Sequence, residues 1–128
     1  MQYLLLIYQA EAAAGSAADD AEMAGELAAY GEFTREARER NLFIAGEALE
    51  PTSTATTLQI REGRTVVTDG PFAETKEALG GFYLLECRDL DEAIEMAAKI
   101  PAATRGTIEI RPIWMLPEAY SMARGGDA

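Results

Sequence analysis

Four ionisable side chains and three glycines fall within one short stretch of this sequence, residues 68–82. The stretch reads Thr-Asp-Gly-Pro-Phe-Ala-Glu-Thr-Lys-Glu-Ala-Leu-Gly-Gly-Phe. Asp69 could act as a general base and Lys76 could orient an anionic group, so these two are the candidate catalytic residues. Arg111, on a later segment, could add an anion clamp. With Phe72 and Glu74 from the same stretch as Asp69 and Lys76, Arg111 completes the set of candidate ligand-binding residues.

The same stretch also has a purely structural interpretation. Asp69 can accept hydrogen bonds from the following backbone amides, Gly70 tolerates unusual dihedral angles, and Pro71 fixes its own φ and disfavours helix before it. Phe72 would then fill the core, and the other charged side chains would be solvated. Arg111 could pair across a sheet instead of binding a ligand. The residues alone leave both interpretations open.

The composition limits which chemistry is available. The sequence contains no histidine, which removes the commonest general base and the commonest metal ligand. We therefore expect no metal site and no cofactor, and any acid-base step must use Asp, Glu, Lys, Tyr or Cys. The single cysteine, Cys87, cannot form a disulfide within the chain and lies in an apolar run, so we expect a buried thiol.

The charge balance bears on possible partners. There are 11 Lys and Arg residues against 22 Asp and Glu residues, a formal net charge of -11. Such a surface repels phosphate backbones and anionic lipids, so we expect neither nucleic acid nor a membrane as a partner. The apolar run 3–8 is too short to span a bilayer and has no basic leader, so it is not expected to be a signal peptide. A cytoplasmic location is the resulting expectation.

Hydrophobic periodicity predicts the elements that position these residues. The predicted strands are 3–8, 42–49, 56–60, 65–68, 82–87 and 107–111, and the predicted helices are 20–40 and the segment between Asp89 and Pro101. Ser16 with Asp19, or Asp19 with Glu22, could cap the first helix, and Asp89 with Glu92 could cap the second. The expected inner stripe of the first helix is Met23, Leu27, Tyr30, Thr34 and Ala37, with Phe33 beside it. The expected inner stripe of the second is Leu90, Ile94 and Ala97.

The order of these elements, β-α-β-(β-β)-β-α-β, predicts an α+β fold. Without the inserted hairpin, it is the split β-α-β pattern of ferredoxin-like folds, an antiparallel sheet with both helices on one face. The central strands are apolar nearly throughout, although the helices cover only one face of the sheet. We therefore expect a second copy of the chain to cover the other face, sheet against sheet, in a homodimer.

Three groups of residues carry a resemblance to a known family. They are the stretch 68–83, the segments 45–49 and 53–57 before it, and Glu109-Ile110-Arg111-Pro112 after it. Together they resemble the DGPF subgroup of YCII-related proteins, over roughly residues 3–114. The resemblance implies a ferredoxin-like fold that dimerises as an α/β barrel, with residues 1–117 as the YCII-related domain and 118–128 as a C-terminal tail.

The resemblance implies less about function. Some YCII-related proteins have a proposed His-Asp dyad, which this sequence cannot form without histidine, and a few act on small aromatic compounds. We expect a small molecule to bind or react in a pocket beside the Asp-Gly-Pro-Phe loop. The alternative is an accessory or regulatory interaction module, because the DGPF subgroup is often encoded beside extracytoplasmic-function sigma factors. Cofactor-free oxygenation of a quinol-like compound rests on fold analogy alone and ranks last.

Overall fold

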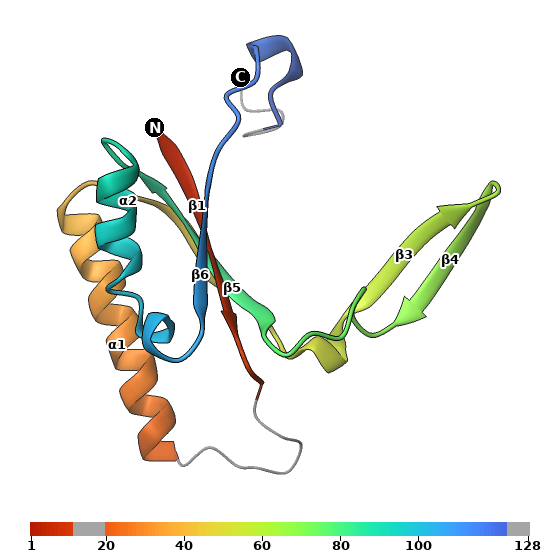
Figure 1. Ribbon diagram of the computed structural model, residues 1–128, viewed down its shortest axis with the longest axis horizontal. Coiled ribbons are helices and arrows are strands. Elements are labelled where there is room, and N and C mark those ends of the chain that lie inside the picture. Colours follow the sequence, from red (N-terminus) through yellow and green to blue (C-terminus); the bar gives the residue numbers. More distant parts are fainter. Residues whose placement is uncertain (12–19, 123–128) are drawn as a thin grey trace.

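The fold combines one antiparallel sheet, two α-helices packed on it, and a separate hairpin (Figure 1). The computed structural model describes residues 1–11 and 20–122. Its strands and helices are β1 (Gln2–Gln9), α1 (Asp20–Glu39), β2 (Phe43–Ala48), β3 (Thr56–Arg61), β4 (Arg64–Asp69), β5 (Ala78–Glu86), α2 (Leu90–Ala97) and β6 (Thr107–Pro112). Short 3₁₀ turns cover Thr52–Thr54, Pro101–Thr104 and Glu118–Tyr120.

The main sheet has the strand order β2-β5-β1-β6, and every neighbouring pair in it is antiparallel. Both helices lie on one face of this sheet (Figure 1). This is the ferredoxin-like arrangement, so the predicted α+β class and the predicted position of the helices are confirmed. Within the described residues, neither helix has the length and apolar character needed to cross a membrane.

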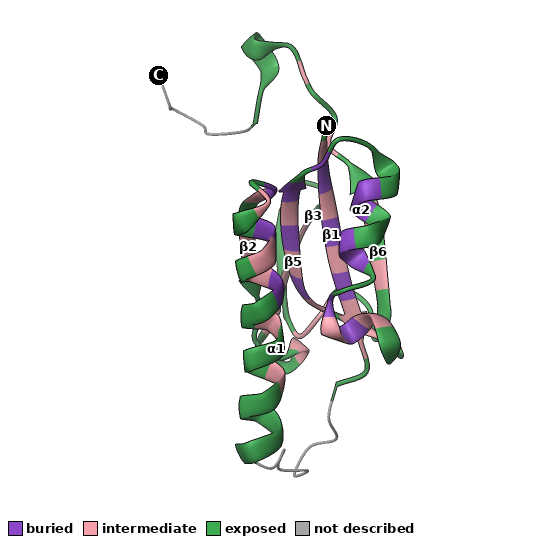
Figure 2. Cartoon of the chain, turned by 90° about the vertical axis from the view of Figure 1, so that its left-hand side faces the viewer, coloured by how far each residue is buried: buried purple, intermediate pink, exposed green. Residues whose placement is uncertain are grey.

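The core lies between the sheet and the helices, where the residues coloured as buried in Figure 2 face one another. Alternate residues of β1 point into it, in the period of two that strands impose. Leu5 is fully buried and lies opposite Tyr83 of β5, while Leu85 lies opposite Tyr3. Cys87 follows directly and is 2% exposed, so the predicted buried thiol is confirmed.

The first helix packs over only part of its length. Phe33 and Ala37 are buried as predicted, but Met23 is 50% exposed and Leu27 is 65% exposed. The predicted inner stripe is therefore wrong in its first half, because those side chains face a groove rather than the packed core. The capping residues expected before Asp20 lie outside the described part of the chain.

The second helix begins as predicted but faces the sheet with different residues. The Asp89 carboxylate accepts a hydrogen bond from the Glu92 amide at 2.9 Å, which confirms the cap. Leu90 and Ile94 are exposed, so their place in the inner stripe is wrong, whereas Ala97 is buried as predicted. The buried face of α2 consists of Glu92, Ala93, Met96 and Ala97. Its two alanines allow a close approach to the sheet.

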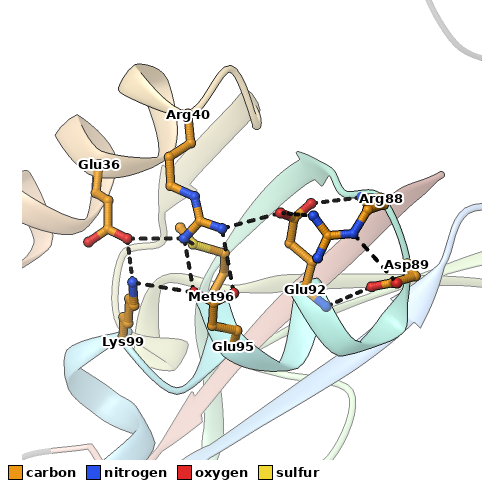
Figure 3. A network of polar contacts seen from close by, with 8 residues as sticks. All are labelled: Glu36, Arg40, Arg88, Asp89, Glu92, Glu95, Met96 and Lys99. Atoms are coloured by element: carbon orange, nitrogen blue, oxygen red, sulfur yellow. Dashed lines mark hydrogen bonds and ion pairs between the residues drawn. The ribbon is translucent and has the colours of Figure 1, made fainter.

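An ion-pair network joins α1 to α2 (Figure 3). The Arg40 guanidinium lies 3.2 Å from a carboxylate oxygen of Glu92, whose side chain is almost buried, and 3.1 Å from one of Glu95. Arg88 contacts the same Glu92 carboxylate with its backbone amide and its side chain. Lys99 pairs with Glu36 beside them. The network satisfies the buried charge and fixes the two helices relative to each other.

Strand β5 begins four residues earlier than predicted, at Ala78 instead of Phe82. The additional residues include Gly80 and Gly81, which pair with the end of β2. A Cβ at Gly81 would lie 2.8 Å from the Glu47 carbonyl oxygen, closer than real side chains come. The glycine therefore lets β2 approach β5, and the sequence motif extends the strand instead of leading into it.

The predicted hairpin is confirmed as a two-stranded arm, β3–β4, that projects on the side of the sheet away from the helices (Figure 1). Its turn residues Glu62 and Gly63 both have positive φ, 51° and 75°, as a tight hairpin turn requires. Every residue of β4 is exposed. Leu58 lies opposite Val67, and these two share one face of the arm with Ile60. All three are exposed, so the arm presents an uncovered apolar face.

Candidate functional site

A groove of about 590 Å³ lies between α1 and the edge strand β2, and we call it the α1–β2 groove. Helix α1 contributes one face to it, at intervals of three or four residues. These helix residues are Met23, Glu26, Leu27, Tyr30, Thr34 and Arg38. The other wall comes from β2 and the residue after it, and the floor comes from Ile7 of β1 and the first half of β5. Its volume lies in the range of small-molecule pockets.

The ring of Tyr83 stands at the floor of the α1–β2 groove, and three residues fix its position. Its centroid lies 4.6 Å from that of Phe33 and 6.4 Å from that of Phe43. A Cβ at Gly46 would lie 2.7 Å from a carbon of the ring. Gly46 therefore makes room for the aromatic floor, which is why a glycine occurs in the middle of an edge strand.

A chain of hydroxyl groups crosses the floor. The Thr34 hydroxyl donates to the Tyr30 carbonyl at 3.0 Å, and Thr34 and Tyr83 hydroxyl oxygens lie 3.1 Å apart. Since a carbonyl can only accept, the Thr34 proton is used there, and the Tyr83 hydroxyl is the donor in the second bond. The Tyr83 oxygen is then left as an acceptor. Burial raises the pKa of the Tyr30 phenol, so this side chain stays neutral at physiological pH.

Three charged residues border the α1–β2 groove, and they have different surroundings. Glu26 forms an ion pair with Arg105, which comes from the turn before β6. Arg38 instead places its guanidinium carbon 4.4 Å from the ring centroid of Phe43. Glu47 also borders the groove, but it lies opposite Phe82 on the alternate positions of β2 and β5. Its side chain therefore points to the face away from the helices.

A second hollow of about 410 Å³ continues from the groove at the end nearer the arm. The two share Gln9, Glu26, Leu49 and Gly80. The second hollow is more polar, because Glu11, Glu50 and Arg105 border it. Glu11 accepts hydrogen bonds from the amide and hydroxyl of Thr52, and these bonds lower the pKa of its carboxyl group.

The structure places the residues of the Asp-Gly-Pro-Phe loop outside the α1–β2 groove. Asp69 ends β4, and Glu74 and Lys76 lie in the connection to β5; all three are exposed. Within residues 1–11 and 20–122, no hydrogen bond or ion pair joins Asp69 to Lys76. Phe72 is 81% exposed, so its interpretation as a core residue is wrong. Two residues earlier, Gly70 has a positive φ of 106°.

Arg111 lies on β6, opposite Leu4 of β1, on the face of the sheet away from the helices. It is exposed and does not border the groove. Arg111 therefore lies on the face of the sheet away from the helices, and Phe72 and Glu74 lie in the connection between β4 and β5, whereas the groove lies between α1 and β2. Of the original stretch, Gly80, Gly81 and Phe82 border the groove.

Sequence reasoning did not identify Arg38, Tyr83 or Gly46 as site residues. A signal for Arg38 existed, because the positions three and four residues away on either side are Thr34, Arg35, Asn41 and Leu42. None of these is acidic, whereas Arg35 and Arg40 each have glutamates at helical spacing and pair with them. The contact between Gly46 and Tyr83 depends on strand pairing, which the local sequence does not specify.

The fold and the groove define a small ferredoxin-like α+β protein with a pocket between a helix and an edge strand. The chain belongs to the YCII-related family, since the model of the YCII-related domain matches residues 1–117. It is also similar to a protein of Rhizobium meliloti (strain 1021) named "Uncharacterized protein R00369", with 51% identity over 67 residues. That alignment spans 51% of this chain and 54% of the relative, so the chain matches about half the length of this curated relative.

Proposed function

We propose that this protein binds a small molecule in the α1–β2 groove. The observation that carries the proposal is the groove itself, about 590 Å³ of space beside an aromatic floor held in place by Phe33, Gly46 and Thr34. Pockets that are mainly apolar with a few fixed polar groups are the usual form of ligand sites. The groove touches the Gly-Gly end of the family motif, not its Asp-Gly-Pro-Phe end.

Blocking the groove tests this proposal. Ala48 lies opposite Gly81 and borders the groove, so Ala48→Phe would fill it with a ring. The matched control is Ala98→Phe at the exposed end of α2, outside the groove. We expect ligand-detected NMR on a fragment library to find fragments that bind the wild type and the control Ala98→Phe but bind Ala48→Phe weakly or not at all. Equal binding to all three proteins would contradict a site in the groove.

We also propose that two copies associate through the faces of their sheets away from the helices. That face carries apolar side chains along its two central strands, Leu4 and Leu6 of β1 and Phe82 and Leu84 of β5, none of which is fully buried in the single chain. The arm projects on the same side (Figure 1). A second copy covering this face would remove apolar surface from water and provide a contact for the arm.

The association state can be measured by sedimentation equilibrium on the full chain. Leu6→Glu adds a charge to the centre of the open face, and Ile94→Glu adds the same charge to an exposed position on α2. We expect a dimer for the wild type and for Ile94→Glu, and a monomer for Leu6→Glu. A monomeric wild type, or a dimer that both variants leave intact, would contradict the proposed interface.

Catalysis by Asp69 and Lys76 is a further proposal that depends on this dimer. Both side chains are exposed in the single chain, where water would compete with any substrate. A partner surface over the loop would have to exclude that water, with Phe72, Glu74 and Arg111 as ligand contacts. Asp69→Asn and Lys76→Ala test the roles separately. Unchanged ligand binding and turnover in both would remove these residues from the site.

An interaction module linked to an extracytoplasmic-function sigma factor is the second candidate function. The net charge of -11 and the exposed apolar face of the arm, formed by Leu58, Ile60 and Val67, are the observations that favour it. Binding of a purified sigma factor of this class, measured at low and moderate salt, would test it, because a contact driven by the net charge of -11 would weaken with salt. Absence of binding at both salt concentrations would count against it.

Membership of the DGPF subgroup and a cytoplasmic location stay predictions.

A further inference from the structure

We propose that the α1–β2 groove selects small amphipathic anions, with a carboxylate bound by Arg38 and an apolar tail lying along α1. The inference rests on the proposed function and adds to it the chemical class of the ligand. Four observations support it: the missing partner of Arg38, its stacking on Phe43, the positions of the nearby carboxylates, and the apolar far end of the groove.

Arg38 differs from the two nearby arginines, Arg35 on α1 and Arg40 just after it. Arg35 pairs with two glutamates at 2.7 Å each, and Arg40 with three others. In the described part of the chain, Arg38 forms no ion pair with a carboxylate. A protein with twice as many acidic as basic residues could readily have paired it, so an unpaired arginine beside a cavity is notable.

The contact with Phe43 leaves the guanidinium available to a ligand. The Arg38 carbon lies 4.4 Å from the ring centroid, so the aromatic face stabilises the cation without using its N–H groups. Those groups lie in the guanidinium plane and match the two oxygens of a carboxylate. The last turn of a helix also favours a cation, but this effect does not require the side chain to stack over the neighbouring strand.

The acidic groups near the groove do not cancel this preference. Glu26 is neutralised by its ion pair with Arg105, and the side chain of Glu47 points to the other face of the sheet. Glu11 and Glu50 border the second hollow, which shares Glu26 and Leu49 with the groove, about three helical turns from Arg38. At physiological ionic strength, charges on the surface are screened beyond about 8 Å. The charge at the Arg38 end of the groove is therefore that of Arg38 itself.

The far end of the groove suits a hydrocarbon chain. Met23 and Leu27 on the first half of α1 and Leu49 after β2 border it, and all three are exposed in the single chain. Arg38 lies some four helical turns along from Met23 on the same face. An anion at one end and apolar side chains along the rest of the length define an elongated ligand with a single charged head.

Three eight-carbon probes with different head groups test the inference: octanoate, 1-octanol and octylammonium. Their binding to the wild-type chain is measured by isothermal titration calorimetry and mapped by amide chemical shifts. Arg38→Met removes the charge and keeps the length of the side chain, and Arg38→Lys keeps the charge but not the planar fork. Arg64→Met, at the tip of the arm and outside the groove, is the matched control.

We expect octanoate to bind the wild type and Arg64→Met equally, Arg38→Lys less tightly, and Arg38→Met about tenfold or more weakly, the size of a charge-assisted hydrogen bond. Binding of 1-octanol should be the same in all four proteins. If 1-octanol and octanoate bind the groove with equal affinity, or Arg38→Met leaves octanoate binding intact, the ligand class is wrong and the groove remains a binding site. If none of the probes shifts groove amides, the ligand class is overturned, and the fragment comparison with Ala48→Phe decides separately whether the groove binds anything.

Discussion

Replacing Gly46 with alanine should destabilise the fold, although alanine is normally the better residue in a strand. The added Cβ would lie 2.7 Å and 2.9 Å from two ring carbons of Tyr83. The ring cannot move away freely, because it packs on Phe33 and its hydroxyl is bonded to Thr34. Overpacking of this kind costs about 1–3 kcal/mol, and removing a strand glycine returns about 0.5–1 kcal/mol. The midpoints of these ranges give an expected net loss of about 1 kcal/mol in the free energy of unfolding.

Urea unfolding followed by far-UV circular dichroism measures this change. The matched control is Gly31→Ala on α1, where an added Cβ meets nothing within 4 Å, so the variant should gain about 0.5–1 kcal/mol. Repeating Gly46→Ala in a Tyr83→Ala background should abolish the loss, because the ring that it meets is gone. The reasoning would be refuted if Gly46→Ala were as stable as the wild type, or if it cost the same with and without the ring.

Three further predictions concern the core and the helix interface. Cys87 is buried and burial raises the pKa of its thiol, so a thiol reagent should react with it only in urea; rapid reaction with the native protein would contradict this. Leu85→Ala should cost about 2–5 kcal/mol in urea unfolding, because Leu85 is fully buried. Arg40 lowers the pKa of the Glu95 carboxyl below 4.5, so this ion pair contributes stability above that pH and loses it as the pH falls through the lowered pKa. The urea midpoint should therefore fall less steeply below pH 4.5 in Arg40→Met than in the wild type, and equal slopes would exclude this role.

Much of the fold could be predicted because its signals are local. Strand β1 is an apolar run of the right length, Asp89 and Glu92 cap α2 as their spacing indicates, and the alternation of Thr56–Arg61 marks the arm. The predictions were wrong where the bounds or the burial of an element depend on a second element that packs against it. β5 starts at Ala78 because glycines allow β2 to pair there, which is a property of two strands together. The predicted stripe of α1 has the correct spacing, but its first half faces a groove instead of a packed surface.

The site was harder to predict than the fold. A cluster of charges beside a turn, such as Asp69 and Lys76, is conspicuous in a sequence, yet the structure leaves both side chains exposed. The groove is a cavity between α1 and β2, and its existence depends on how these two elements pack, which no single residue type predicts. Two residues indicate the position of the groove. Gly46 leaves room for the ring of Tyr83, and Arg38 has no acidic residue three or four positions away along the helix.

The arm has a consequence for the order in which the protein opens. Its two strands pair with each other and belong to a separate sheet, so their backbone hydrogen bonds do not depend on those of the main sheet. An isolated two-stranded hairpin is marginally stable in water. The arm is therefore a separate cooperative unit that can unfold and refold while the core stays intact. The fraction of molecules with a folded arm should therefore depend on whether a partner covers Leu58 and Val67, and not on the stability of the main sheet and helices.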